Sequence, residues 1–442
     1  MRIIDRVASA LQDVFGECAE AAGRTSGVIR RKRKFDAISL AKTFVLGFLQ
    51  KPSASDEELA QMAAQLGVVV TPQAIDQRHA PRTANFLEEL FRHTVRWVVG
   101  SKKSLAPILE RFTSVTLMDS TIINLPAEMK QRFAGCGGPL GGGQAAMKLQ
   151  VELDLRSGAL THLGIEEGRQ TDGATIRQHA RRGPGSLRIA DLGYFSTAVF
   201  VEMAVAAEYF LSRLQFGVGV MLPDGQKIQL LSWLRKQPQA LIDHPIRINF
   251  QQPFACRMIA WRLSPEQTSR SRRKLRKSLL RKSGKQPSAE RLAWCGWTIL
   301  LTNVAEELLV APEAIVLYRA RWQIELLFKR WKSQDLVALL SGSTVVRQMI
   351  RLWSRLIAAV IQHWLIIAGA WGDPHKSLSK LCEAVRSFVG RIAAGLGRRS
   401  ELRRTLRDLA RVLHHTCRRN KRKNPGTFEL LNDVDLLEFA LT

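Results

Sequence analysis

The sequence predicts an α/β protein in which helices cover a mixed β-sheet, with a helical region before the sheet and another after it. Residues 1–110 and 346–442 carry apolar side chains at helical spacing, whereas short alternating runs typical of strands begin near residue 112. Three consecutive strands are then followed by alternating helices and strands. That order is typical of a sheet with helices packed on its faces.

Five strands are predicted in the first half of the sheet. They span residues 114–119, 147–155, 160–167, 187–193 and 208–215. Residues 171–182 are expected to form a helix that ends at Gly183-Pro184-Gly185, and residues 196–207 a second helix. Alternation along the second strand places Asp154 on its polar side, so we expect this carboxylate to be exposed.

Beyond the fifth strand the regular alternation stops. We interpret residues 216–296 as a mostly β insertion that also carries a basic, helix-prone run at 270–282. A strand begins again at Trp297, and a long helix is expected from about residue 312 to residue 333. The remainder of the chain is helical and basic.

The composition favours a polyanionic partner. The 442 residues include 66 Lys and Arg against 39 Asp and Glu, a formal net charge of +27. Neutralising phosphates with so many cations releases condensed counterions, so nucleic acid is the first expectation. An anionic membrane and a merely solubilising charge are the alternatives. Basic clusters at 30–34, 270–282 and 418–423 should supply phosphate contacts, while contacts to bases set the sequence preference.

Three features of the sequence bear on the cellular compartment of the protein. Six scattered cysteines form no C-x-x-C pair, which argues against a disulfide scaffold or zinc ribbon and fits a reducing cytoplasm. The first 15 residues have an amphipathic pattern that includes Asp5 and Arg6, unlike a signal peptide. The apolar stretch 356–371 is shorter than the roughly 20 residues of a membrane span. We therefore expect a buried core helix there and no membrane partner.

Residues 56–78 have the rhythm of two helices joined by a turn. Gly67 can end the first helix, and Thr71-Pro72 can begin the second as N-cap and first helical residue. This pattern is compatible with a helix-turn-helix that reads DNA. An ordinary helical hairpin has the same pattern, and both interpretations stay open.

The predicted helix at 312–333 has two distinct faces. At about 100° per residue, Tyr318, Arg321, Glu325 and Lys332 fall within an arc of roughly 60°. A separate apolar stripe is expected to pack on the core. It consists of Leu317, Ala320, Ile324, Leu327 and Trp331. The polar face suits an anionic, metal-bearing ligand, although a salt-bridged helix surface would look the same.

Two aspartates are natural partners for Glu325. Asp119 is expected to end the first strand and Asp191 to end the fourth. Functional groups of open sheets gather beyond the carboxyl ends of strands, so these three carboxylates could form an oxygen cage for Mg²⁺. A simple strand-end cap is the alternative for either aspartate.

These motifs together resemble a known family. Asp119-Ser120-Thr121, then D-L-G-Y-F at Asp191, then Y-x2-R-x3-E-x6-K from Tyr318 resemble the DDE transposases of the bacterial insertion-sequence 4 family. The likeness covers roughly residues 50–340, and the four-residue signature is met at every spacing.

The resemblance implies a domain organisation. It implies an RNase H-like core interrupted by the mostly β insertion and flanked by helical regions. The expected segments are a helical DNA-binding domain at 1–110, a first core segment at 111–215, the insertion at 216–296, a second core segment at 297–345 and a helical C-terminal region at 346–442.

The resemblance also implies roles for individual residues. Asp119, Asp191 and Glu325 would bind two Mg²⁺ ions, for which Mn²⁺ can substitute. The DNA contacts would be Tyr318, Arg321 and Lys332 at phosphates near the cleaved end, Trp297 at a base flipped from a hairpin, and Arg213 at the same DNA end. For Trp297 the alternative is a core tryptophan at a strand start.

The predicted function is that of a bacterial insertion-sequence transposase. Such an enzyme binds terminal inverted repeats in double-stranded DNA, pairs two ends as a homodimer and moves the element by cleavage and strand transfer through a hairpin. Two other interpretations remain: a standalone nuclease that only hydrolyses, and a non-catalytic DNA-binding protein.

Overall fold

The computed structural model describes residues 3–29, 34–136, 144–332, 344–420 and 425–433, without the side chain of Lys282. The chain divides into two compact units. Unit 1 comprises Met1–Leu105, Ser120–Gln170 and Ile324–Lys423, and unit 2 comprises Ala106–Asp119, Thr171–Gln323 and Asn424–Thr442. Portions of two predicted basic clusters, residues 30–33 and 421–423, lie outside the described residues. The predicted linear boundaries at 110, 215, 296 and 345 remain predictions.

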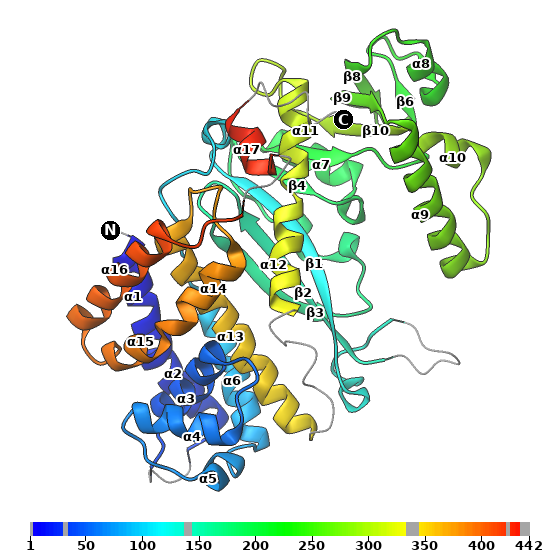
Figure 1. Ribbon diagram of the computed structural model, residues 1–442. Helices are drawn as coiled ribbons and strands as arrows, with labels where there is room; N and C mark the ends of the chain where they lie inside the picture. Colours follow the sequence, from blue (N-terminus) through cyan, green and yellow to red (C-terminus); the bar gives the residue numbers. More distant parts are fainter. Residues whose placement is uncertain (1–2, 30–33, 137–143, 333–343, 421–424, 434–442) are drawn as a thin grey trace. The chain divides into compact units, whose positions relative to one another are not determined.

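Unit 1 draws its helices from both ends of the chain, and both end regions are helical as predicted. These helices are α1 (Ile3–Asp13), α2 (Ala19–Ser26), α3 (Ala37–Gln50), α4 (Asp56–Gln65), α5 (Pro72–Asp76), α6 (Pro81–Thr94), α13 (Val345–Ala370), α14 (Leu378–Ser387), α15 (Val389–Gly395) and α16 (Arg399–His415). Helix α13 packs against α3, α6 and α16 (Figure 1). The N-terminal and C-terminal helices therefore share one hydrophobic core, which contains the fully buried Trp353 and Trp364.

Helix α13 is the core helix predicted at residues 356–371, but it is longer than predicted. It has 26 residues and starts after Thr344, whose side chain accepts a hydrogen bond from the Arg347 amide. It is the one helix in the described ranges that is long and apolar enough to cross a membrane. Within unit 1, however, 89% of its most apolar window is buried. The expectation of a buried core helix is confirmed.

A ten-stranded mixed sheet extends through both units because β1 belongs partly to each. The strand order is β3-β2-β1-β4-β5-β10-β9-β8-β6-β7. The strands are β1 (Val115–Asn124), β2 (Ala146–Asp154), β3 (Leu160–Glu167), β4 (Leu187–Ala190), β5 (Tyr209–Arg213), β6 (Val220–Met221), β7 (Lys227–Ile228), β8 (Leu241–Ile248), β9 (Phe254–Arg262) and β10 (Trp297–Thr302). Strands β1, β4 and β5 run parallel, whereas β10 is antiparallel to both β5 and β9. The predicted α/β class is confirmed.

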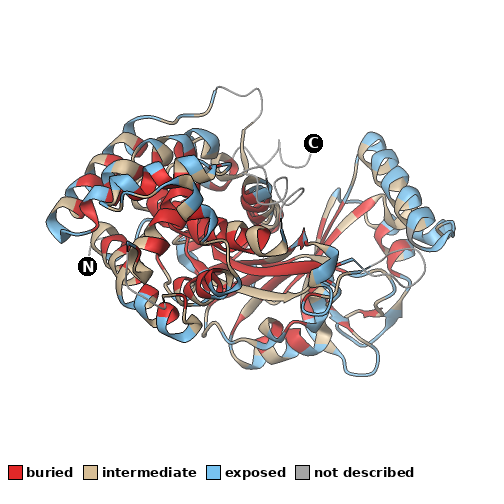
Figure 2. Ribbon diagram, turned by 90° about the horizontal axis from the view of Figure 1, so that it is seen from below, coloured by how far each residue is buried: buried red, intermediate tan, exposed pale blue. Residues whose placement is uncertain are grey.

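The prediction that Asp154 is exposed is wrong. Strand β2 lies between β1 and β3, and all nine of its residues are buried, including those on the face expected to be polar. Figure 2 shows how much of the sheet is buried. The Asp154 carboxylate accepts hydrogen bonds from the amides of Arg156 and Ser157 at 3.3 and 3.0 Å. Its charge therefore stabilises the turn after β2, because a buried carboxylate requires hydrogen-bond donors.

Unit 2 contains most of the remaining helices. They are α7 (Thr197–Val205), α8 (Leu230–Lys236), α9 (Pro265–Ser283), α10 (Ala289–Trp294), α11 (Ala311–Arg319) and α17 (Thr427–Asn432). Helix α7 matches the prediction for 196–207 and packs on β5. The predicted helix at 171–182 is wrong. Two short 3₁₀ turns, Asp172–Ala174 and Ile176–His179, flank Thr175, whose extended backbone (φ −68°, ψ 132°) interrupts helical geometry.

The segment 216–296 is more helical than the predicted mostly β insertion. Helices α8, α9 and α10 together contain more residues than strands β6 to β9. The long run of Lys, Arg and Leu in α9 explains the difference, because these unbranched side chains favour helix. The insertion shares one hydrophobic core with β5, α7 and β10. Met258 of the insertion belongs to the same cluster of buried residues as Phe210 and Trp297.

The helix predicted at 312–333 is divided into α11 and α12 (Trp322–Trp331). Between them the Arg321 amide donates to the Tyr318 carbonyl at 3.1 Å, and the Gln323 amide donates to the Ala320 carbonyl at 2.9 Å. These i to i+3 bonds tighten the turn there. The predicted apolar stripe is confirmed. Leu317, Ala320, Ile324, Leu327 and Trp331 are all buried.

Candidate active site

Asp119 and Asp191 lie side by side on neighbouring parallel strands. The register of β1 with β4 pairs Leu117 with Ile189 and Met118 with Ala190, so the next residues are the two aspartates. Asp191 keeps an extended backbone (φ −77°, ψ 168°). Neighbouring residues in parallel register point to the same face of a sheet, with strands about 4.8 Å apart. The two carboxylates therefore face the same space.

The position predicted for Asp119 needs one correction. It does not end its strand, because β1 continues to Asn124. The strand that ends at this level is β4, whose last residue is Ala190. Asp119 is thus held by strand geometry on both sides, whereas Asp191 is the first residue beyond its strand. Its side chain is 48% exposed, against 16% for Asp119.

The motif D-L-G-Y-F holds Asp191 in place. A 3₁₀ turn, Leu192–Tyr194, follows it, and the Tyr194 amide donates to the Asp191 carbonyl at 3.0 Å. Tyr194 is 1% exposed and packs with Met118 and Ala190, the residues that precede the two aspartates. Gly193 leaves room for Asp172, whose Oδ2 would lie only 2.7 Å from a Cβ at this position. This motif therefore fixes the backbone that carries one carboxylate.

Arg321 places its guanidinium between the two carboxylates. Its Nη1 donates to Asp119 Oδ2 at 3.3 Å, and its Nη2 lies 4.0 Å from Asp191 Oδ1. One cation is thus shared by two carboxylates in a partly exposed position. Hard divalent ions such as Mg²⁺ favour this kind of oxygen donor set. Asp119 and Asp191 therefore suit a divalent metal ion, because these two carboxylates already share one cation, the Arg321 guanidinium.

Tyr318 and Arg213 complete the polar surroundings of Asp191. Burial, followed by the negative charge of Asp191, raises the pKa of Tyr318 to about 12, while the cations Arg321 and Arg213 oppose that rise. Arg213 ends β5, and continuing the parallel register from Ile189 and Leu211 aligns it with Asp191. The row Asp119, Asp191 and Arg213 thus crosses three neighbouring strands at one level.

Glu325 and Lys332 belong to unit 1, where α12 continues. Glu325 is half-buried in the first turn of α12, and Lys332 is exposed just after its last residue. In the described ranges, no three His, Cys, Asp or Glu side chains gather closely enough to hold a metal ion. Unit 2 by itself thus supplies a pair of carboxylates, and the role of Glu325 remains a prediction.

Trp297 is the first residue of β10 and is only 6% exposed. Its ring belongs to the core shared by the insertion and β5. The guanidinium carbon of Arg262 lies over the ring, 5.1 Å from its centroid. These contacts agree with the alternative of a core tryptophan. Arg262 was not singled out by sequence reasoning, because its position over the ring follows from the pairing of Trp297 with Arg262 across two strands.

The candidate helix-turn-helix is capped as predicted, but its second helix is short. The Thr71 side chain caps α5, and Gly67 has φ +83° after α4. Helix α5 has only five residues and ends before Arg78. Asp56 and Asp76 both form ion pairs with Arg347 at the start of α13. These contacts, which the sequence did not indicate, tie the hairpin to the core of unit 1. A role in DNA reading remains a prediction.

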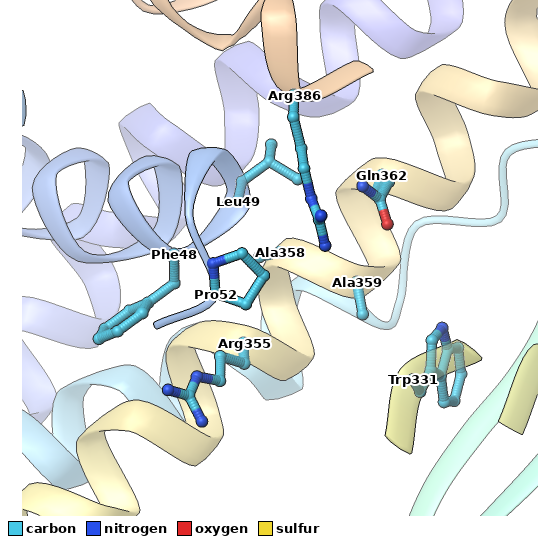
Figure 3. A pocket seen from close by; sticks show the side chains of 9 residues that line it. All are labelled: Phe48, Leu49, Pro52, Trp331, Arg355, Ala358, Ala359, Gln362 and Arg386. Atoms are coloured by element: carbon cyan, nitrogen blue, oxygen red, sulfur yellow. The ribbon is translucent and has the colours of Figure 1, made fainter. Parts of the chain in front are cut away.

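Two cavities of unit 1 were not predicted. Figure 3 shows the smaller, where Trp331, Arg355, Gln362 and Arg386 surround a volume of about 20 Å³. That volume fits a water molecule but no nucleotide. The larger is an open groove of about 570 Å³ between α6 and β3, where the Glu88 carboxylate pairs with both Arg92 and Arg132. Neither lining contains a pair of carboxylates like Asp119 and Asp191.

The fold and the carboxylate pair define an α/β enzyme whose carboxylates at a sheet edge suit metal-assisted chemistry on phosphate esters. The Transposase DDE domain family matches residues 110–361, and the chain belongs to that family. It is therefore an enzyme that cleaves and transfers DNA strands, as predicted, and enzymes of this kind use divalent metal ions. The ten-stranded sheet with its helices is consistent with the RNase H-like fold of such domains.

Similar proteins cover most of the chain. The transposase for insertion sequence element IS231B of Bacillus thuringiensis subsp. berliner is 27% identical over 369 residues, 77% of this chain and 75% of its own length. The transposase for IS1151 of Clostridium perfringens is 24% identical, with 70% of each chain covered. The putative transposase InsL for IS186A of Escherichia coli K12 is 25% identical over 71% of this chain and 81% of its own.

Proposed function

We propose that this enzyme is the transposase of a bacterial insertion sequence of the insertion-sequence 4 type. It binds the terminal inverted repeats of its element and moves that element by cut and paste through a hairpin intermediate. The observation that carries the proposal is the pair Asp119 and Asp191, aligned in register around one cation. Similarity to insertion-sequence transposases over about three quarters of the chain supports the choice of substrate.

Three carboxylates are proposed to hold the metal: Asp119, Asp191 and Glu325. Glu325 follows Arg321 by four positions, and both belong to the spacing Y-x2-R-x3-E-x6-K, which supports including Glu325 in the set. Two Mg²⁺ ions, or Mn²⁺ in their place, would supply activation of the attacking hydroxyl and stabilisation of the leaving oxygen. The carboxylates fix those ions, and the nearby cations orient the phosphate.

The proposed phosphate contacts are Arg321, Arg213, Tyr318 and Lys332. The Arg321 guanidinium would contact a phosphate through its planar, two-pronged donor geometry, with the aspartates as the residues that would hold metal. Arg213 ends β5 at the level of Asp191. The Tyr318 hydroxyl, held protonated by its raised pKa, can donate a hydrogen bond to a phosphate oxygen.

Trp297 is proposed as the platform for a base flipped from the hairpin. The Arg262 side chain that covers its ring occupies the position that a stacked base would take. Base binding therefore requires Arg262 to move aside, and its guanidinium could then pair with the phosphate of the flipped nucleotide. Stacking on tryptophan would offset some of the cost of unstacking the base.

The active assembly is proposed to be a homodimer that pairs two element ends in the bacterial cytoplasm. The test uses purified full-length protein with a duplex that carries an element end, a target plasmid and Mg²⁺. We expect nicking at the element boundary, a hairpin on that end and joining of the freed 3′-hydroxyl to the plasmid. Cleavage without any joined product would indicate the standalone nuclease instead. Binding without cleavage at any Mg²⁺ concentration would indicate the non-catalytic DNA-binding protein.

A further inference from the structure

Helix α9 in unit 2 carries a stripe of cations along one face. The stripe consists of Arg270, Arg273, Lys274, Lys277 and Arg281, all exposed. At about 100° per residue these five side chains fall within an arc of roughly 100°, and at 1.5 Å per residue they extend over about 16 Å. Figure 1 shows α9 next to α10, at the end of the insertion. Glu266 is the one acidic residue of the helix, in its first turn.

Within the described part of unit 2, the five stripe cations are not engaged by another side chain. Some nearby cations are: Arg272 donates to the Leu292 carbonyl at 3.0 Å, Arg262 covers Trp297, and Arg291 covers Phe216. None of the five stripe residues makes an ion pair or side-chain hydrogen bond with another residue in the described ranges. Five adjacent like charges repel one another, so this surface is suited to a polyanion.

The sheet places the start of α9 at the edge that carries the catalytic carboxylates. Parallel strands β4 and β5 end at this edge near Asp191 and Arg213, and β1 carries Asp119 at the same level. Strand β10 is antiparallel to β5 and so begins at this edge with Trp297, which pairs with Arg262 at the end of β9. Helix α9 starts three residues later, at Pro265. All of these residues belong to unit 2.

Strand spacing gives the scale of this arrangement. Four steps between neighbouring strands separate β1 from β9, about 19 Å at roughly 4.8 Å per step. Adding the length of the stripe, about 16 Å, gives a total near 35 Å. One turn of duplex DNA has the same length, about 34–36 Å. A duplex held at the carboxylates can therefore reach the whole stripe within one turn.

We propose that the α9 stripe binds the sugar-phosphate backbone of duplex DNA within one helical turn of the cleaved bond. This inference rests on the proposed function, because that function puts the cleaved bond at Asp119 and Asp191. The contacts are made to phosphates and carry no base sequence by themselves. The stripe thus orients the duplex across the sheet edge, while other elements choose the sequence.

The test compares two charge-matched double variants of the full-length protein. Arg273→Gln with Lys277→Gln removes two stripe charges, and Arg235→Gln with Lys236→Gln removes two exposed charges from α8. Affinity for a 30-base-pair duplex with an element end is measured without divalent metal between 50 and 200 mM salt. Each lost phosphate contact lowers the slope of log affinity against log salt by about 0.9. The wild type should therefore lose about twelvefold more affinity over this range than the stripe variant.

The α8 variant is expected to keep the wild-type slope. Equal slopes for the wild type and the stripe variant, or equal changes in both variants, would overturn the proposal. Circular dichroism confirms that both variants are folded. A duplex with neutral methylphosphonates in the first ten base pairs from the cleaved bond should erase the difference between wild type and stripe variant. If methylphosphonates erase this difference only when they lie more than ten base pairs from the cleaved bond, the proposed placement of the stripe is wrong.

These measurements distinguish a failure of the proposed α9 binding surface from a failure of the proposed function. If the stripe changes the salt dependence but the wild-type protein neither nicks nor joins DNA, the proposed function is wrong and the binding surface stands. If the protein nicks and joins DNA while the stripe has no effect on salt dependence, the proposed function stands and the surface is wrong.

Discussion

Asp119 and Asp191 occupy equivalent positions on two adjacent parallel strands, each directly after one member of the pair Met118 and Ala190. Seventy-two residues of chain separate them, yet the sheet register sets them side by side on one face. The Arg321 guanidinium lies between them, within 3.3 Å of one and 4.0 Å of the other. Four predictions follow from this site and from the core of unit 1.

Replacing either aspartate should abolish cleavage without loss of DNA binding. Asp119→Asn and Asp191→Asn keep the size of the side chain but remove the charge that a divalent ion requires. We expect Mg²⁺-dependent nicking to fall by more than about a hundredfold, since even outer-shell changes affect metal sites by 10–100-fold. Glu306→Gln, at an exposed carboxylate of unit 2, is the matched control and should nick normally. Nicking by Asp191→Asn at the wild-type rate would refute the assignment.

Removing Arg321 should strengthen metal binding. The guanidinium and a metal ion compete for the same pair of carboxylates, and a unit charge about 4 Å away is worth about 1 kcal/mol even in water. Arg321→Ala should therefore bind Ca²⁺, which probes the site without turnover, about fivefold more tightly by calorimetry. Arg276→Ala, at an exposed arginine of α9, serves as control. Weaker Ca²⁺ binding by Arg321→Ala would show that the guanidinium does not share the space of the metal.

Tyr318 should titrate above the ordinary range of tyrosine. Its pKa is raised to about 12, first by burial and then by Asp191. Because the folded-state pKa lies above the unfolded value near 10, the associated stability is complete below pH 10 and is lost as pH rises toward 12. The chain has three tyrosines, so ultraviolet titration can follow them individually. Tyr318→Phe should remove the transition near pH 12 and flatten the loss of stability between pH 10 and 12. An unchanged titration curve would contradict this.

His363 should make unit 1 sensitive to acid. Burial lowers the pKa of its imidazole to about 4, and its Nε2 donates to the Gly158 carbonyl at 2.7 Å. Position 158 requires glycine, because it has φ +75° and a Cβ there would meet the Trp371 ring at 2.4 Å. Because the folded-state pKa is depressed, stability present above pH 6.5 is lost as pH falls toward 4, up to about 3 kcal/mol.

The measurement is urea unfolding at pH 7.0 and pH 4.5. His363→Gln keeps a donor for the Gly158 carbonyl but cannot take up a proton, so its difference in unfolding free energy between the two pH values should shrink. His415→Gln, at an exposed histidine of α16, should keep the wild-type difference. Equal pH dependence in all three proteins would mean that His363 is protonated as easily in the folded state as in the unfolded state.

Much of this protein could be predicted from its sequence, because the signals are local. Apolar periodicity predicted the helical ends of the chain, the strands around Asp119 and Asp191, and the buried stripe from Leu317 to Trp331. The motif D-L-G-Y-F and the spacing of Tyr318, Arg321 and Glu325 indicated a DDE transposase, and the match to the Transposase DDE domain family over residues 110–361 shows that the chain is one. Charge counting over the whole chain predicted a nucleic-acid partner. The signals for helices, strands and faces each lie within about twenty consecutive residues, where spacing alone determines which side chains share a face.

Tertiary structure decided what local spacing cannot. Asp154 is buried because both faces of β2 are covered, although its own strand alternates as one with an exposed face would. The sequence 171–182 forms two 3₁₀ turns, because Thr175 has an extended backbone between them. The alignment of Asp119 with Asp191, the pairing of Arg262 with Trp297 and the start of α9 just beyond Arg262 all depend on strand register. Register is set by pairing between residues far apart in the chain, and no single segment contains that information.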